Sequence, residues 1–207
     1  LNGKRQPIYD MQGQQNGTIW VEELGPPSSI LAEAAKALAP FPVPKVQVNV
    51  YQYWPFKPSA GHAATLPSTA LQIHALAVQQ RWIEVLERAG AAGVEDLPRD
   101  PDGVGRAAAV KQLMMTLRSA FRNDPALGDR MRELLAGDGA QLALTAAEYR
   151  LVTALTGLYE GADNRYLNFY GPPGTIPNIP YNAVLGSDAA RVSSSELDFT
   201  GKVVFVG

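Results

Sequence analysis

The apolar residues of this 207-residue chain change their spacing abruptly between two neighbouring segments. In Lys45–Tyr53, three valines alternate with polar residues, a period of two that is typical of a strand with one buried face. In Ser68–Ala89 the apolar residues instead recur every three or four positions, which indicates an amphipathic helix. Because both periods occur in one chain, we predict an α/β fold.

The longest predicted helix is Ser68–Ala89, which follows a loop over Pro55–Leu66. Its apolar band covers more than one face, and a band of that width suits a helix that packs on two sides. The residues expected to face the core are Leu71, Ala75, Val78, Trp82, Val85, Leu86 and Ala89, with Ile73, Leu76 and Ile83 beside them.

Four shorter helices are predicted from their boundary residues and apolar stripes. Prolines and serines open Pro26–Pro40 and a proline closes it, as is usual at helix ends. Further helices are expected at Arg106–Arg122 and Ala126–Ala136. Thr145 and Glu148 form a capping box, so another helix begins there and continues to about residue 159. The expected inward residues are Ile30, Leu31, Ala34, Ala35, Leu38, Val110, Leu113, Met114, Leu117, Phe121, Leu151, Val152, Leu155, Leu158 and Tyr159.

The two ends of the chain carry weaker patterns. Leu1–Gln15 is polar and aperiodic, so we expect a loop or a frayed end, followed by a short strand at Thr18–Val21. Towards the C-terminus we expect a strand at Arg165–Tyr170, one helical turn at Tyr181–Leu185 and a buried last strand at Val203–Val206.

No internal repeat or linker divides the chain. We therefore predict a single α/β domain over residues 24–207, in which helices flank a central β-sheet, preceded by a loop and short strand in residues 1–23. The chain begins with Leu rather than Met, and its last segment reads as a strand cut short, so we expect a piece of a longer protein.

Composition excludes several classes of site and partner. The chain has no cysteine, which removes disulfides, zinc ribbons, iron–sulfur clusters and thiol nucleophiles. Its formal net charge of −2 argues against a general nucleic-acid binder, which needs a basic excess. No apolar run approaches the roughly 18 residues that a membrane-spanning helix requires.

The usual catalytic and metal-binding motifs are not found. No carboxylate stands three or four positions from either histidine, His62 or His74, so we expect no metal site. Gly171–Thr175 contains two prolines and no lysine, and therefore predicts a rigid turn rather than a phosphate-binding loop. The adjacent carboxylates Glu22 and Glu23 are interpreted as solvated charges. We predict no catalytic, cofactor-binding or metal-binding residue in the chain.

Two clusters remain as candidate surfaces. Lys111, Arg118 and Arg122 fall on one helix face, which is typical of the solvated side of an amphipathic helix and less often of a site for anionic lipid or an acidic partner. Tyr51, Tyr53, Trp54 and Phe56, with Lys57, form a dense aromatic cluster where a strand ends and a loop begins. Ligands of α/β folds gather beyond strand ends, so Tyr51, Tyr53, Trp54 and Lys57 are the candidate ligand-binding residues. The competing interpretation is that the aromatic residues are core anchors beneath the loop.

The C-terminal forty residues carry three blocks in a fixed order. The first is Arg165–Pro177, the second is Tyr181–Leu185, and the third is Gly201–Gly207. In this order and spacing they resemble the C-terminal signature of the type-two CHASE domain, and Thr65–Gln72 is similar to a helix start in the same family. The matching motif residues, to which the resemblance assigns a structural role, are Tyr170, Gly171, Pro172, Gly174, Thr175, Pro177, Gly201 and Lys202.

The resemblance implies an extracytoplasmic sensory domain of a bacterial membrane receptor. Such a domain is a signal-input module tethered through flanking transmembrane helices to an adenylate or guanylate cyclase, a histidine kinase or a serine/threonine kinase. It would carry no enzymatic activity itself, would bind an unidentified small molecule or environmental ligand, and would act as a homodimer, because those outputs work as dimers. Its last strand would lead toward the membrane. Ile176, Pro180 and Asn182 depart from the family pattern, and the family's N-terminal strand–helix–strand unit is not recognised before Leu24.

Two other functions are considered. The second interpretation, after the sensor domain, is a soluble extracytoplasmic protein that binds a small molecule, which would need no spanning helix after Gly207. A hydrolase or transferase that uses carboxylates would instead require a cleft with a strongly shifted acidic pKa.

Overall fold

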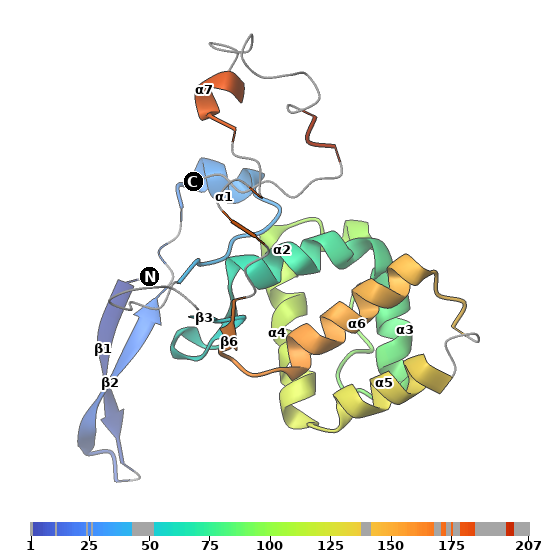
Figure 1. Ribbon diagram of the computed structural model, residues 1–207. Coiled ribbons are helices and arrows are strands. Elements are labelled where there is room, and N and C mark those ends of the chain that lie inside the picture. Colours follow the sequence, from blue (N-terminus) through green and yellow to red (C-terminus); the bar gives the residue numbers. More distant parts are fainter. Residues whose placement is uncertain are drawn as a thin grey trace. The chain divides into compact units, whose positions relative to one another are not determined.

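The computed structural model describes residues 2–10, 12–23, 25, 27–42, 52–137, 142–167, 171–172, 175, 179–184 and 198–200. The chain divides into two compact units, Leu1–Tyr166 and Leu167–Gly207, and each is described by itself. The prediction of a mixed α/β chain is confirmed, because the described residues form both helices and paired strands (Figure 1).

The described strands pair into three small antiparallel sheets. These are β1 (Asn2–Tyr9) with β2 (Gln15–Glu23), β3 (Gln52–Tyr53) with β6 (Arg165–Tyr166), and β4 (Phe56–Lys57) with β5 (Ala63–Ala64). Among the described residues no sheet has more than two strands, so a large central sheet is not evident there. Of the predicted strand Lys45–Tyr53, residues 45–51 lie outside the described residues, as does the predicted strand Val203–Val206.

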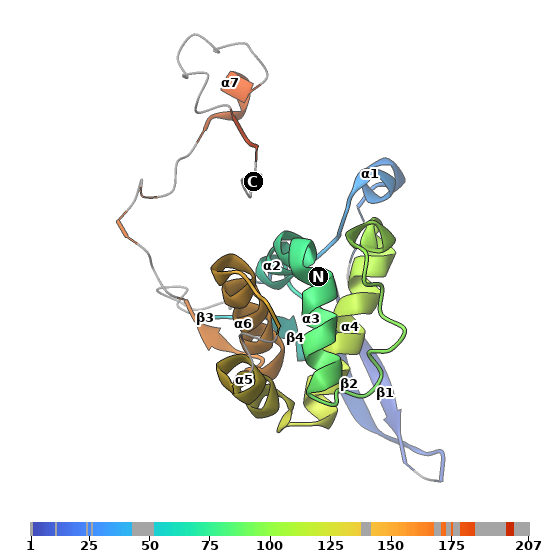
Figure 2. The same ribbon diagram turned by 90° about the vertical axis from the view of Figure 1, so that its right-hand side faces the viewer.

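The helices of the first unit gather around one apolar core (Figures 1 and 2). They are α2 (Leu66–His74), α3 (Gln79–Arg88), α4 (Ala107–Asn123), α5 (Leu127–Gly137) and α6 (Ala146–Glu160). The last three lie within one residue of their predicted bounds, and the capping box at Thr145 and Glu148 is confirmed. The predicted inner stripe of α4 is buried throughout, and that of α6 is buried except for the half-buried Leu151.

The prediction of one unbroken helix over Ser68–Ala89 is wrong. A 3-10 segment, η2 (Ala75–Val78), separates α2 from α3. Ala75, Leu76 and Val78 are all buried. With three residues per turn, Ala75 and Val78 eclipse each other in the 3-10 segment, and the break leaves the wide apolar band of this stretch in the core.

The prediction of a loop or frayed end over Leu1–Gln15 is also wrong, whereas the strand predicted at Thr18–Val21 is confirmed within β2. β1 and β2 form an antiparallel hairpin, in which Lys4 pairs with Val21 and Gln6 with Ile19. Its turn is closed by Asp10, whose carboxylate accepts the backbone N–H groups of Gln12 and Gln14. Every described side chain in residues 3–9 and 12–20 is exposed, so no buried face imposes the alternating pattern by which strands are recognised.

The helix predicted within Pro26–Pro40 is shorter than expected. Only α1 (Ser29–Ala34) is helical, and a helix of this length is marginal without tertiary packing. Three of its predicted inward residues are exposed: Ile30 at 77%, Ala34, and Leu38, beyond the helix, at 44%. The predicted loop Pro55–Leu66 holds β4, β5 and a 3-10 turn, η1 (Pro58–Ala60).

The second unit is described in part. The predicted helical turn near Tyr181–Leu185 is confirmed as α7 (Tyr181–Val184), in which the N–H of Ala183 donates to the carbonyl of Pro180. Earlier in this unit, the backbone N–H and the hydroxyl of Thr175 both donate to the carbonyl of Pro172, at 3.1 and 2.8 Å.

Candidate functional site

The predicted binding surface centres on the ammonium group of Lys57, at the end of β4. Lys57 Nζ lies 3.7 Å from the centroid of the Trp54 ring, which covers one side of the charge. On the other side, Nζ lies 3.3 Å from Glu22 Oε2 at the end of β2, and the Lys57 side chain is only 12% exposed. We call Trp54, Lys57, Ser59 and Glu22 the lysine site.

Glu22 is bound rather than solvated, so the interpretation of Glu22 as a free surface charge is wrong. Ser59 Oγ, in η1, donates a 2.6 Å hydrogen bond to the same carboxylate oxygen that faces Lys57. The Ser59 hydrogen bond, followed by that from the Lys57 ammonium and its charge, lowers the pKa of the Glu22 carboxyl below its ordinary value. Glu22 is therefore charged at neutral pH and ties the hairpin to the loop between β4 and β5.

The aromatic cluster divides between the two interpretations considered for it. Phe56 is 1% exposed and its ring lies 5.6 Å from that of Tyr159, so Phe56 is a core anchor. Tyr53 and Trp54 are half-buried and lie at the edge of the body. Tyr51 lies outside the described residues. The structure thus brings Trp54 and Lys57 together and removes Phe56 from the candidate surface.

The core also contains a cluster of three aromatic rings. Trp82, Phe121 and Tyr159 have ring centroids 5.9 to 6.3 Å apart and nearly parallel planes. The Tyr159 hydroxyl donates to Gln72 Oε1 at 2.7 Å, and burial raises the pKa of that hydroxyl well above its ordinary value. Tyr159 is therefore a neutral hydrogen-bond donor at all physiological pH values, with a structural role.

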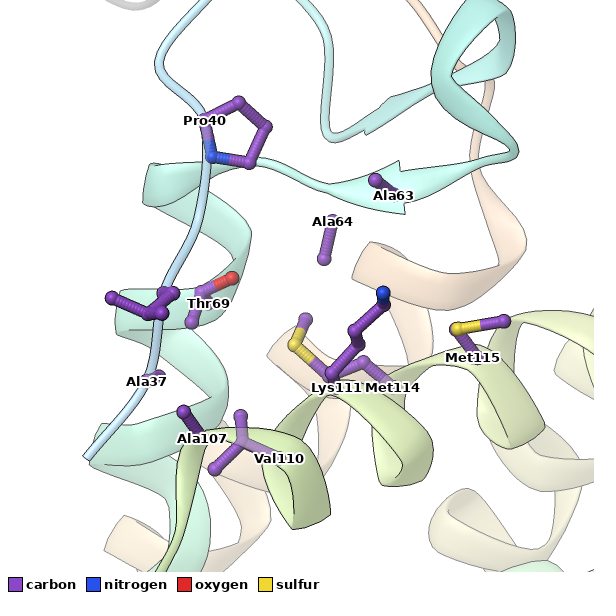
Figure 3. Close-up of a pocket in the computed structure, with 11 residues that line it drawn as sticks. Ala37, Pro40, Ala63, Ala64, Thr69, Ala107, Val110, Lys111, Met114 and Met115 are labelled. Carbon is purple, nitrogen blue, oxygen red and sulfur yellow. The ribbon is translucent and has the colours of Figure 1, made fainter. Parts of the chain in front are cut away.

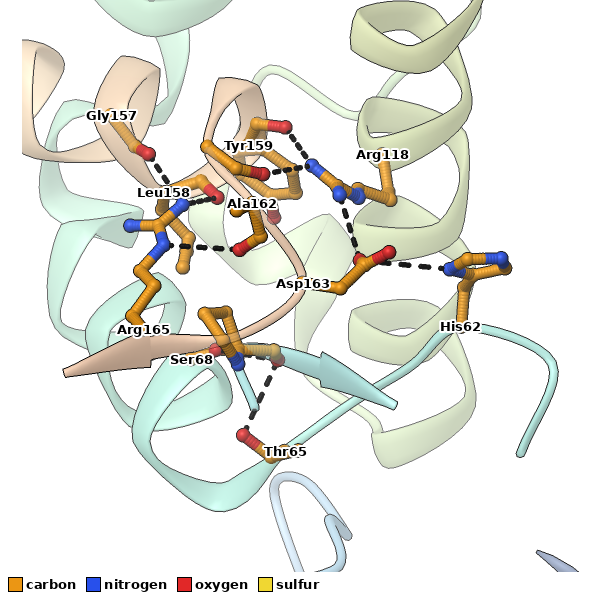
Figure 4. Close-up of polar contacts among 12 residues, drawn as sticks. His62, Thr65, Ser68, Arg118, Gly157, Leu158, Tyr159, Ala162, Asp163 and Arg165 are labelled. Carbon is orange, nitrogen blue, oxygen red and sulfur yellow. Dashed lines mark hydrogen bonds and ion pairs between the residues drawn. The ribbon is translucent and has the colours of Figure 1, made fainter. Parts of the chain in front are cut away.

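Arg118 departs from the solvated basic face predicted on α4, whereas Lys111 and Arg122 are exposed as predicted. The Arg118 side chain is 7% exposed and crosses the ring of Phe56, with Cζ 4.8 Å from the centroid. Its guanidinium donates to the carbonyls of Tyr159 and Gly161 and, at 2.8 Å, to Asp163 Oδ1 (Figure 4). Arg118 borders the apolar stripe, and its guanidinium lies over the ring of Phe56 while it donates to the free carbonyls at the end of α6.

His62 stands beside this ion pair. Its Nδ1 lies 3.7 Å from Asp163 Oδ1, beyond hydrogen-bond reach, and makes no hydrogen bond (Figure 4). His62 also has a φ of 58°, a conformation uncommon for a residue with a side chain. The other histidine, His74, is exposed on α2 and has no described contact with this group. From the sequence, the two histidines were tested as metal ligands, and no local pattern relates His62 to Arg118.

The segment after α6 links this cluster to the lysine site. Arg165 donates to the carbonyls of Gly157 and Leu158 at 2.7 and 2.8 Å, and so holds the last turn of α6 (Figure 4). Its backbone pairs with Tyr53 across the β3–β6 sheet. Tyr53 in turn precedes Trp54 of the lysine site, so both clusters share the strand that leads to the second unit.

A separate small cavity opens between α4 and the segment that follows α1 (Figure 3). Its volume is about 30 Å³, and its lining is apolar except for Thr69 and Lys111. Ligand pockets usually measure roughly 300–1,000 Å³, so this cavity is too small to hold a metabolite.

The predicted structural motif is described at three positions, Gly171, Pro172 and Thr175. Gly171 has a φ of +155°, and a Cβ there would lie 2.3 Å from Thr175 Oγ1, so glycine is required for this close approach. The other motif residues lie outside the described residues: Tyr170, Gly174, Pro177, Gly201 and Lys202.

Neither a metal centre nor a membrane span is found in the described part of the chain. Its His, Asp and Glu side chains form no group of three that could hold an ion. No helix there combines the length and apolar character needed to cross a bilayer.

The chain matches no family model, no curated protein sequence and no solved structure. The resemblance to type-two CHASE domains therefore depends on the motif residues alone.

Proposed function

We propose that the chain is the extracytoplasmic signal-input domain of a membrane-bound receptor, similar to type-two CHASE domains. In this proposal the output is an adenylate or guanylate cyclase or a kinase, attached through flanking transmembrane helices, and the receptor is a homodimer. The input domain itself is not an enzyme, and its ligand binds at the lysine site.

The observation that carries the proposal is the order of the three C-terminal blocks, Arg165–Pro177, Tyr181–Leu185 and Gly201–Gly207. Geometry supports the roles that the resemblance gives to the first two. Gly171 occupies a backbone conformation that needs glycine, Thr175 closes the turn onto Pro172, and α7 coincides with the second block. These features favour a connector rather than a ligand loop.

The proposal includes a finer arrangement of the fold. The pairing of β3 with β6 joins the last residues of the predicted strand Lys45–Tyr53 to the first residues of the predicted strand Arg165–Tyr170. We propose that these strands belong to one central sheet together with Val203–Val206, and that this last strand leads toward the membrane. A ligand-dependent shift of the sheet would then change the spacing or pitch of the following helices.

The native coding sequence beyond Gly207 tests the proposal directly. Two or three apolar helices followed by a cyclase or kinase domain would support it. A stop codon there, with a cleavable signal peptide upstream, would contradict it and favour a free extracytoplasmic binding protein.

Regulation of the receptor gives a second test. Replacing Val206 by a flexible Gly/Ser linker should uncouple output from signal, as should Gly171→Ala, which places a Cβ against Thr175. Gly137→Ala is the matched control, because no atom lies within 4 Å of the added Cβ. Normal regulation in both altered receptors would rule out transmission through this connector.

A further inference from the structure

We propose that Lys57 and Ser59 form a carboxylate-binding site that the chain's own Glu22 occupies in the absence of ligand. A small carboxylate then competes with Glu22 and releases the hairpin from the body. The binding step depends only on the residues at this site. Its description as the receptor's signal rests on the proposed function.

The donors at this site converge on a single carboxylate oxygen. Ser59 Oγ lies 2.6 Å from Glu22 Oε2, and Lys57 Nζ lies 3.3 Å from the same atom. An ammonium group and a hydroxyl are both donors toward an anion, and hydrogen bonds to charged acceptors are the stronger kind. The pair therefore recognises a carboxylate by charge and by two donors from one short loop.

Lys57 requires an anionic partner in this place. Its side chain is almost covered, and the face of Trp54 lies against the ammonium on one side. A charge withdrawn from water in this way is costly unless it is paired. When Glu22 leaves, another carboxylate that reaches the same position restores that pairing.

The hairpin is weakly packed against the rest of its unit. Its exposed strands bury little apolar surface, since Ile8, Tyr9, Ile19 and Trp20 are between 41% and 62% exposed. The Glu22 side chain is itself 31% exposed, so its place can be reached from solvent. Because the Glu22 side of the pair is open to solvent, a dissolved carboxylate can compete for the Lys57 ammonium.

Displacement of Glu22 can affect the strands from which the chain enters the second unit. Lys57 follows Trp54 and β3 closely, and Tyr53 of β3 pairs with Arg165 of β6, which leads into Leu167. Release of the hairpin thus acts on the strand pair from which the C-terminal connector begins.

The test is a titration of the whole 207-residue chain with sodium acetate, followed by the NMR shifts of the Trp54 indole N–H and the Ser59 amide. Sodium chloride at equal ionic strength and acetamide, a neutral analogue, are the reference titrants. Glu22→Ala should bind acetate about tenfold more tightly than the wild type, because the internal competitor is gone. Glu84→Ala is the matched control, since Glu84 pairs with Arg81 at a distance from the lysine site.

Two further variants identify the donors. Added to Glu22→Ala, Lys57→Met should abolish acetate binding, and Ser59→Ala, which leaves the buried stem of Lys57 intact, should weaken it several-fold. Equal acetate affinity in the wild type and Glu22→Ala would overturn the proposal, as would an equal response to acetamide or chloride. Acetate binding in Glu22→Ala that persists without Lys57 would do the same.

The result also separates this inference from the proposed function. Tight acetate binding by Glu22→Ala, together with a stop codon after Gly207, would keep the carboxylate site and reject the receptor. No acetate binding, together with transmembrane helices and an output domain, would keep the receptor and reject the site.

Discussion

The helical body and the N-terminal hairpin are stabilised in different ways. The body encloses Trp82, which is 0% exposed and stacks on two other rings. The hairpin exposes Trp20 at 62%, where the ring lies beside Gly3 and Arg5. An isolated two-stranded hairpin is at best marginally stable in water, so its contact with the body through Glu22 matters. The difference indicates that the hairpin can detach while the body remains folded.

The largest effect expected is the contrast between two tryptophan substitutions. Trp82→Ala should lower the free energy of unfolding by about 3–5 kcal/mol, because it leaves a cavity in the ring stack. Trp20→Ala should change it by less than about 0.5 kcal/mol, because the ring is largely exposed. Urea denaturation of both variants measures these effects. Similar losses in the two would contradict the separation of body and hairpin.

The second-largest effect is expected for Arg118. Arg118→Met should lower the free energy of unfolding by about 2 kcal/mol, because Asp163 and the carbonyls at the end of α6 lose their donor. Arg118→Lys should retain only part of the stability that Arg118→Met loses, since an ammonium lacks the planar fork of a guanidinium. Arg122→Met, on the exposed side of α4, is the control and should be nearly neutral. Equal stability of the Arg118 and Arg122 variants would exclude an anchoring role.

A smaller effect is expected at the start of α6. Thr145→Ala removes the hydroxyl that accepts the Glu148 N–H, one of the two hydrogen bonds of the capping box, and should cost about 1 kcal/mol of unfolding free energy. The hydrogen bonds from Thr145 lower the pKa of the Glu148 carboxyl, so the cap stabilises the chain above the ordinary carboxyl pKa and its contribution is lost as pH falls through the lowered pKa. Thermal unfolding at pH 7 and at pH 3 should therefore show a larger difference between wild type and variant at pH 7. If the stability difference between wild type and variant were the same at both pH values, a stabilising role of the charged Glu148 cap would be contradicted.

The smallest effect on the free energy of unfolding is expected for loss of the contact between Glu22 and the Lys57–Ser59 pair. Glu22→Ala should leave the free energy of unfolding within about 0.5 kcal/mol of the wild type, because it frees only the hairpin. Since the pKa of Glu22 is lowered in the folded chain, this contact should be complete at neutral pH and lost as pH falls through that lowered pKa. Proteolysis within residues 12–19 should accelerate at neutral pH in the variant alone. No acceleration would show that other contacts hold the hairpin.

The sequence predicted the parts of the fold in which burial imposes a period. The stripe of Val110, Leu113 and Phe121 on α4 follows from 3.6-residue spacing, and the box at Thr145 is local to one turn. Strand β1 of the hairpin was missed because the described side chains of residues 3–9 are all exposed and impose no alternating pattern.

The candidate site was predicted only in part, because its residues come from separate segments. Trp54 and Lys57 are neighbours in the sequence and were recognised as a surface. Glu22 lies 37 positions before Ser59, and no local pattern relates the two. Arg118 was assigned to a solvated face because its helical position borders the apolar stripe, where a long side chain can turn either way.

Native-state hydrogen exchange of the wild type and Glu22→Ala tests the central claim most directly. The account predicts that the slowest amides of α3, α4 and α6 exchange at the free energy of global unfolding in both proteins, and that β1 and β2 amides exchange at a lower free energy that falls further in the variant. Hairpin amides that exchange only with global unfolding, or a variant that loses protection equally in hairpin and body, would contradict it.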